Sequence, residues 1–243
     1  MSSDAKKHNK MNNFNTNPFE VLIFDLDGTL IDSAPDVCAS MNRVLTDMGR
    51  RELTLEETKD MVGWGGRVLA EKALAKTGDA GTEDDVERAL EGFLVTYAQH
   101  PADHSIVFPG VIEVLDTFKA AGVRMGLCTN KPTATTPPVL EAMGLSKYFD
   151  VVSCGDAVPH KKPDGRHVSL VVEQMGATIK TAAMVGDSES DITAASNAGV
   201  RSVAVTFGYA HVPCIELGAD ALIDHFQDLP QALVNIASTA VAS

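Results

Sequence analysis

An alternation of short apolar runs with helical patterns fills the chain from Pro109 onward and restricts the fold more than any other feature. Apolar residues spaced three and four apart predict helices, whereas short apolar runs bounded by glycine or polar residues predict buried strands. Strand–helix alternation predicts a parallel sheet with helices on both faces, a Rossmann-like α/β core. The strands are expected at residues 123–128, 149–153, 182–185, 202–205 and 221–223, and the helices at residues 111–121, 132–143, 168–175, 191–198 and from about 229.

A further strand is expected near the N-terminus, where the apolar residues 21–23 precede Phe-Asp-Leu-Asp-Gly-Thr-Leu-Ile-Asp-Ser at residues 24–33. The apolar run ends at Asp25, and Gly28 follows in a position typical of a turn. Asp25 and Asp27 therefore come after the carboxyl end of a central strand, where open α/β sheets bind ligands. Two neighbouring carboxylates need a cation or a shared proton to offset their repulsion. A divalent ion together with a phosphate group meets this need.

The segment between Ser33 and the proline-containing connection at residues 101–109 has a helical pattern throughout. Helices are expected at residues 37–48, 54–62, 67–76 and 82–99, and the last of them begins with a capping-box pattern at Thr82 and Asp85. We therefore expect an all-helical domain at residues 34–104, inserted into an α/β core made of residues 19–33 and 105–243. Residues 1–18 are expected to form a flexible extension.

Three further motifs follow in order along the chain. Thr129-Asn130 ends an expected strand, Lys162-Pro163 lies in a later connection, and Gly-Asp-Ser-Glu-Ser-Asp at residues 186–191 follows another expected strand. With the Asp-Leu-Asp-Gly-Thr segment, this ordered set resembles the haloacid dehalogenase superfamily of phosphate-ester hydrolases, over residues 20–235. Four motifs in the right order match by chance far less often than one short motif does. The resemblance implies that the helical insertion is a cap over the active site.

The resemblance also implies a role for each acidic residue of the motifs. Asp25 is expected to be the nucleophile that forms an aspartyl-phosphate. Asp27 is expected to be the general acid for the leaving alcohol and then the base for the attacking water. Mg²⁺ is the expected cofactor, held by Asp25, the backbone carbonyl of Asp27, and Asp187. Asp191 is expected to support this site and the start of its own helix.

Contacts with the phosphate are expected from the two middle motifs. Thr129 and the backbone N–H groups after it would face the phosphate with Asn130 assisting, and the alternative is that the threonine caps the next helix. Lys162 would neutralise the phosphoryl oxygens and the nucleophile. Lys131 and Lys161 lie beside these motifs, where an ordinary surface lysine is the usual interpretation. The proline after Lys162 and the superfamily pattern select Lys162 among the three.

Substrate choice is expected to depend on a glycine-rich segment of the helical domain, residues 61–69. Gly65 and Gly66 allow backbone N–H groups to approach an anion at the start of a helix, and Arg67 is a candidate partner for a substrate carboxylate. The segment resembles the cap loop of phosphoglycolate phosphatases, although many of those have a polar residue where this chain has Trp64. The alternative is an interhelical turn in which Trp64 packs against the core and Arg67 is solvated.

The expected function is therefore Mg²⁺-dependent hydrolysis of a small phosphorylated metabolite, with 2-phosphoglycolate as the leading substrate. One alternative is a phosphatase for another small ester, such as a sugar phosphate or pyridoxal phosphate. Two others are a sugar-phosphate mutase that uses the same aspartyl-phosphate, and a non-catalytic binding protein that retains the fold.

Composition restricts the partners and the compartment. The net charge of −13 argues against a nucleic acid or an anionic membrane as the partner. No apolar stretch is long enough to span a bilayer, so no membrane partner is expected. Four widely spaced cysteines are typical of a reduced protein, and the chain is expected to be cytoplasmic, as a monomer or a homodimer.

Overall fold

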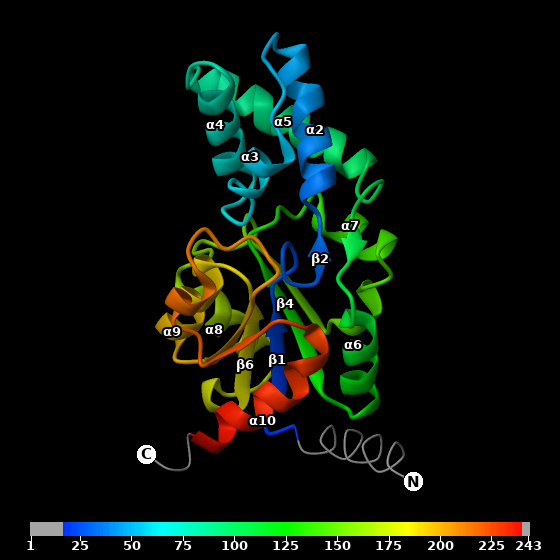
Figure 1. Cartoon of the computed structure of the whole chain (residues 1–243), viewed down its shortest axis with the longest axis vertical. Coiled ribbons are helices and arrows are strands. Elements are labelled where there is room, and N and C mark those ends of the chain that lie inside the picture. The colour runs from blue at the N-terminus through cyan, green and yellow to red at the C-terminus, as the bar shows by residue number, and fades with distance from the viewer. Residues whose placement is uncertain (1–16, 240–243) are drawn as a thin grey trace.

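A six-stranded parallel sheet lies at the centre of the computed structural model, which describes residues 17–239 (Figure 1). The predicted Rossmann-like α/β fold is confirmed. The extension predicted at residues 1–18 falls outside the described residues, except for its last two. The strands run in the order β5 (Val151–Cys154), β4 (Arg124–Thr129), β1 (Val21–Phe24), β6 (Ala182–Gly186), β7 (Arg201–Val205) and β8 (Ala221–Ile223), and all neighbouring pairs are parallel.

Alternate side chains of β1 enter two different apolar cores, as the two-residue period of a strand requires. Val21 and Ile23 pack with α8 (Gly165–Gln174) and α9 (Glu189–Ala198) on one face. Leu22 and Phe24 pack on the other face, whose core also contains side chains of α6, α7 and α10. The remaining elements of this core domain are α6 (Val111–Ala120), α7 (Thr136–Ala142), α10 (Leu229–Thr239) and the 3₁₀ helices η2 (Ser146–Tyr148), η3 (Ile179–Thr181), η4 (Cys214–Leu217) and η5 (Phe226–Asp228).

Four helices lie together beyond the carboxyl end of β1 (Figure 1). They are α2 (Ala34–Asp47), α3 (Leu55–Lys59), α4 (Gly66–Thr77) and α5 (Glu83–Gln99). The expected capping box is present, because the Thr82 side chain accepts from the Asp85 N–H and the Asp85 carboxylate accepts from the Thr82 N–H. Gly92 of α5 allows α2 to approach closely, since a Cβ there would lie 3.1 Å from a methyl group of Val44.

The structure differs from the sequence-based expectation at two connections. The chain enters and leaves the helical segment through a short antiparallel pair, β2 (Ile31–Asp32) and β3 (Ile106–Val107), that no sequence pattern predicted. The helix expected from residue 132 begins only at Thr136. Residues 137 and 138 are prolines without an N–H, and such residues are tolerated only in the first turn of a helix.

Over the described range, none of the helices combines the length and the apolar character that crossing a membrane would require.

Candidate active site

Three neighbouring strands of the sheet bring the predicted acidic and phosphate-binding residues together. Asp25 directly follows β1, and its N–H donates to the Val185 carbonyl of β6 at 3.0 Å, which continues the strand pairing by one residue. Thr129 is the last residue of β4, and Asp187 directly follows β6. Because β4, β1 and β6 are adjacent and parallel, their carboxyl ends meet at one edge. The local strand endings therefore determine which side chains converge.

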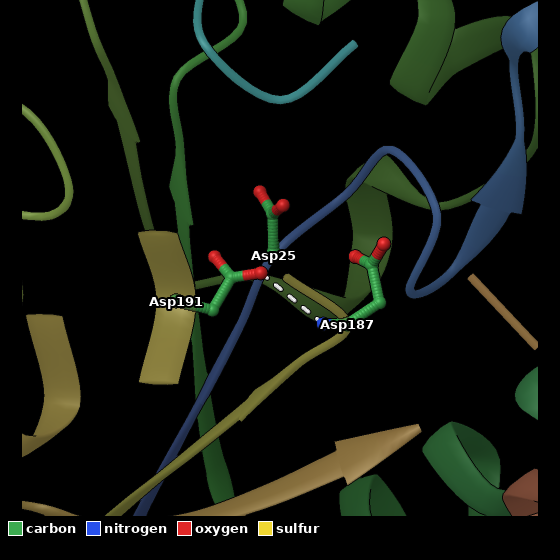
Figure 2. Close-up of side chains that lie close together, drawn as sticks. All are labelled: Asp25, Asp187 and Asp191. Carbon is green, nitrogen blue, oxygen red and sulfur yellow. Dashed lines mark hydrogen bonds between the residues drawn. The ribbon is translucent and has the colours of Figure 1, made fainter. Parts of the chain in front are cut away.

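Asp25, Asp187 and Asp191 form a buried acidic cluster (Figure 2). One carboxylate oxygen from each residue can be chosen so that all three atoms lie within 4.8 Å of one another. The expected Lys162 joins this cluster, with its Nζ 2.9 Å from Asp25 Oδ1 and 2.6 Å from Asp191 Oδ1. Lys162 itself is 1% exposed. The lysine selected from the sequence is therefore the one that lies against the expected nucleophile.

Asp191 is held in place by hydrogen bonds on both of its oxygens. Oδ1 accepts from Lys162, whereas Oδ2 accepts from the N–H groups of Asp187 and Ser188 at 3.1 and 3.0 Å and from the Ser188 hydroxyl at 2.7 Å (Figure 2). This geometry forms a capping box at the start of α9. The side chain therefore orients Lys162 and the turn that carries Asp187, in line with the supporting role expected for it.

Asp187 is positioned by two groups that sequence reasoning did not single out. Its Oδ1 accepts from the Thr29 hydroxyl at 2.8 Å, and its Oδ2 accepts from the Tyr209 N–H at 2.7 Å. The backbone packs tightly around this carboxylate, because a Cβ at Gly28 or at Gly208 would lie 2.3 Å from an atom of Asp187. Gly28 also has a φ of +85°, a backbone conformation that residues with a side chain rarely adopt. Thr29 belongs to the Asp-Leu-Asp-Gly-Thr motif, so the sequence could have identified it as a site residue. No local sequence pattern marks Tyr209.

The acidic cluster has the electrostatic character of a cation site. Burial raises the pKa of Asp25 to about 7, with repulsion from Asp191 adding to the shift and Lys162 opposing it. Burial, followed by repulsion from Asp191 and Asp25, raises the pKa of Asp187 well above its usual range. Asp25 Oδ1 forms the ion pair with Lys162 but has no well-aligned hydrogen bond. A divalent cation would relieve this repulsion, and the hard carboxylate oxygens suit Mg²⁺.

Asp27 has a different environment, centred on a lysine that was interpreted as an ordinary surface residue. Lys131 is 5% exposed, and its Nζ lies 3.0 and 3.2 Å from the two carboxylate oxygens of Asp27. The same ammonium donates to the hydroxyl of Tyr97, in α5, at 2.7 Å, and Asp27 also accepts from the Ser33 hydroxyl at 2.5 Å. Burial acts to lower the pKa of Lys131, but Asp27 and Tyr97 outweigh it and raise that pKa to about 12. The surface interpretation of Lys131 was wrong, because the loop after β4 turns its side chain inward.

The glycine-rich loop of the helical segment reaches the same site through its backbone. Gly65, with a φ of +93°, and Gly66, the first residue of α4, both line the cavity beside Asp25. The core domain holds this loop by two hydrogen bonds to carbonyl groups. Asn130 Nδ2 donates to the Gly63 carbonyl at 2.9 Å, and Lys161 Nζ donates to the Trp64 carbonyl at 2.7 Å. Asn130 therefore lines the cavity while its amide nitrogen docks the loop.

Arg67 is not brought to the site. Its guanidinium forms ion pairs with Glu71, Glu83 and Glu87 among side chains that are all exposed to solvent. It does not line the cavity, and the expectation that it contacts a substrate carboxylate is corrected accordingly. Gly66 and Arg67 are neighbours in α4 but lie in different surroundings. The backbone of Gly66 faces the cavity, whereas the Arg67 side chain points to the glutamates of α5. The Trp64 ring likewise packs outside the cavity, 5.9 Å from the ring of His211.

The cavity between the sheet edge and the helical segment has a volume of about 30 Å³. At roughly 10–15 Å³ per molecule, this is room for about two waters. Its core side presents Asp25, Asp27, Thr129 and Lys131. Its helical side is mostly apolar and contains Val37, Met61, Val62, Leu69 and Phe93, besides Tyr97 and the glycine-rich loop.

Comparison with known proteins assigns the chain to a family. The model of the haloacid dehalogenase-like hydrolase family matches residues 22–205. The phosphoglycolate phosphatase of Agrobacterium fabrum is 41% identical over 87% of this chain and 91% of its own, and that of Caulobacter vibrioides is 39% identical over 91% and 93%. A crystal structure from Haemophilus somnus, named a predicted phosphoglycolate phosphatase, is 31% identical with a TM-score of 0.85, over 89% of this chain and 98% of that one. The chain therefore belongs to the haloacid dehalogenase-like hydrolase family and groups with its phosphatases.

Proposed function

We propose that this protein hydrolyses 2-phosphoglycolate to glycolate and phosphate, with Mg²⁺ as its cofactor and Asp25 as its nucleophile. One observation carries the mechanism: Asp25 lies 2.9 Å from the buried Lys162 and beside Asp187, at the wall of a small cavity. The names of the relatives at about 40% identity supply the substrate.

In the proposed reaction, a carboxylate oxygen of Asp25 attacks phosphorus and the ester oxygen leaves with a proton from Asp27. Asp27 then takes a proton from the water that hydrolyses the aspartyl-phosphate. Lys162 holds positive charge beside the nucleophile throughout, and Thr129 offers its hydroxyl to a phosphoryl oxygen. Asp25, the carbonyl of Asp27, and Asp187 would hold Mg²⁺, which supplies charge neutralisation for the phosphoryl group.

The cavity walls favour a small substrate with few hydroxyl groups. The helical side is lined by five apolar side chains, so the hydroxyls of a sugar phosphate would lose hydrogen bonds with water and gain few partners. In 2-phosphoglycolate, a single methylene group separates the ester oxygen from the carboxylate. This methylene group can pack against the apolar side chains of the helical segment while the phosphate contacts the polar side chains of the core.

We further propose that residues 34–104 act as a cap that opens to admit the substrate. A cavity of about 30 Å³ is smaller than a phosphate ester, and we expect the helical segment to move away from the core when the substrate binds. The loop at residues 63–66 is docked by Asn130 and Lys161 through hydrogen bonds that exchange readily with water. Closing the cap excludes bulk water from the reacting phosphoryl group.

Phosphate release by the purified protein tests the proposal, with Mg²⁺ and a panel of 2-phosphoglycolate, sugar phosphates, pyridoxal phosphate and nucleotides. We expect kcat/KM for 2-phosphoglycolate of about 10⁴ M⁻¹s⁻¹ or more, well above the rest. Asp25→Asn is expected to abolish hydrolysis of every ester, and EDTA to remove the activity reversibly. A profile that favours sugar phosphates would retain the phosphatase and reject this substrate. The cytoplasmic location and the monomeric or homodimeric state stay predictions.

A further inference from the structure

Lys131 is a buried charged residue that the proposed chemistry does not use. It lines the cavity with Asp25 and Asp27, and of the described residues that line this cavity it is the one with a cationic side chain. Its ammonium carries three N–H donors. One donates to the Tyr97 hydroxyl, and a single bifurcated N–H can serve both oxygens of the Asp27 carboxylate, at 3.0 and 3.2 Å, so the remaining N–H can serve a molecule in the cavity.

The other cations near the site are committed elsewhere. Lys162 is fully buried between Asp25 and Asp191, and in the proposed reaction it neutralises the phosphoryl group. Lys161 donates to the Trp64 carbonyl on the outer side of the loop, and Arg67 is paired with three glutamates. Of these four cations in the described part of the chain, Lys131 is thus the one available for the part of a substrate that extends away from the phosphate.

We propose that Lys131 binds the carboxylate of the substrate and thereby selects 2-phosphoglycolate over esters that lack a second anion. This inference rests on the proposed function. Asp27 has to lie against the ester oxygen in order to protonate it, and the substrate carboxylate begins one methylene group from that oxygen. Lys131 Nζ lies 3.0 Å from Asp27 Oδ1, which places it within reach of the carboxylate. The hydrogen bond would join two charged groups in a largely apolar cavity, and such charge-assisted bonds are stronger than neutral ones.

Tyr97 makes this selection depend on the cap. Its hydroxyl accepts from Lys131 at 2.7 Å, and the ammonium lies 4.3 Å from the centre of its ring. Tyr97 lies in α5 of the helical segment, whereas Lys131 belongs to the core domain. Asp27 holds the ammonium from the core side, and Tyr97 adds its contact only while the helical segment is packed on the core. Tyr97 is a positioning residue for the carboxylate-binding lysine.

The test compares 2-phosphoglycolate with ethyl phosphate, which has the same ester linkage and no carboxylate. The measured quantity is the ratio of the two kcat/KM values, because a change at Asp27 affects both substrates and cancels in that ratio. We expect Lys131→Met to lower the ratio about 100-fold, as loss of a charged hydrogen bond implies. Lys131→Arg should restore part of the ratio, and Tyr97→Phe should lower it by about 10-fold.

The matched control is Lys180→Met, at an exposed position in η3 just before the amino end of β6, which should leave both kcat/KM values unchanged. If Lys131→Met does not fold, Lys131→Gln keeps a polar head group, and we expect the same fall in the ratio. An equal loss for both esters would overturn the inference, since Lys131 would then act only through Asp27. A wild-type enzyme without preference between the two esters would instead reject the proposed substrate.

Discussion

Replacing Asp25, the proposed nucleophile, is expected to stabilise the metal-free protein at alkaline pH. Burial and the neighbouring carboxylates raise the pKa of Asp25 from its ordinary value of 3.8 to about 7. Below pH 4, Asp25 is protonated in both the folded and the unfolded chain, and it contributes no pH dependence. Between pH 4 and pH 7 the unfolded chain ionises while the folded protein retains the proton, so stability falls as the pH rises. Above pH 7 the loss is complete.

The size of the effect follows from the difference between these two pKa values. A gap of about three pH units corresponds to roughly 4 kcal/mol at ~1.4 kcal/mol per unit. Asparagine resembles the protonated acid in shape and carries no charge. We therefore expect Asp25→Asn to raise the free energy of unfolding by at least about 2 kcal/mol at pH 8.5 relative to wild type, and by clearly less at pH 5.

Urea unfolding in EDTA at the two pH values measures this difference through the linear dependence on denaturant. Asp150→Asn, at an exposed position, is the matched carboxylate-to-amide control and should change little at either pH. Adding Mg²⁺ should stabilise the wild type and have a much smaller effect on Asp25→Asn. A variant that is no more stable than wild type at pH 8.5 would show that the buried carboxylates do not oppose folding, and the argument for a cation site would fail with it.

Three further outcomes follow from the same contacts. Lys162→Met leaves Asp191 buried without its cation, and we expect a loss of about 3–5 kcal/mol in urea unfolding together with a fall in kcat of about 10²–10³-fold. Asp36→Ala removes a buried carboxylate of α2 that accepts hydrogen bonds from the N–H and the hydroxyl of Ser105, just before β3. We expect it to lower the free energy of unfolding by about 2–4 kcal/mol in the urea assay, and a change below about 0.5 kcal/mol would contradict this. Tyr209→Phe removes a hydroxyl that is hydrogen-bonded to Asp32 and Ala34, on either side of the junction between β2 and α2. It should lower stability by about 1–2 kcal/mol in thermal unfolding, while the backbone N–H of residue 209 keeps its contact with Asp187.

Much of the site could be predicted because its residues occupy the ends of strands. Asp25, Thr129 and Asp187 each come at or directly after a short apolar run, and the carboxyl ends of adjacent parallel strands must meet at one edge. The role of Asp191 was predictable for a similar reason, since a carboxylate in the first turn of a helix is a local feature.

The errors arose where a side chain could point in more than one direction. Lys131 and Lys161 both lie beside a motif in the sequence, yet the first is buried against Asp27 and the second is exposed. Arg67 follows two cavity-lining glycines but turns toward Glu83 and Glu87 of another helix. No local pattern distinguishes these outcomes, because the partner in each case lies on a segment distant in the chain.

The parallel sheet, the helical insertion and the acidic residues at the sheet edge could all be predicted from the chain alone. These features depend on periodicity and on neighbours a few residues away, which a single chain displays directly. Three features emerge only in the folded protein: which cation faces the cavity, how the glycine-rich loop docks on the core, and the presence of Tyr209 and Tyr97 at the site. Those contacts join residues 22 to 67 positions apart, so only the packing of distant segments of the chain against one another brings them together.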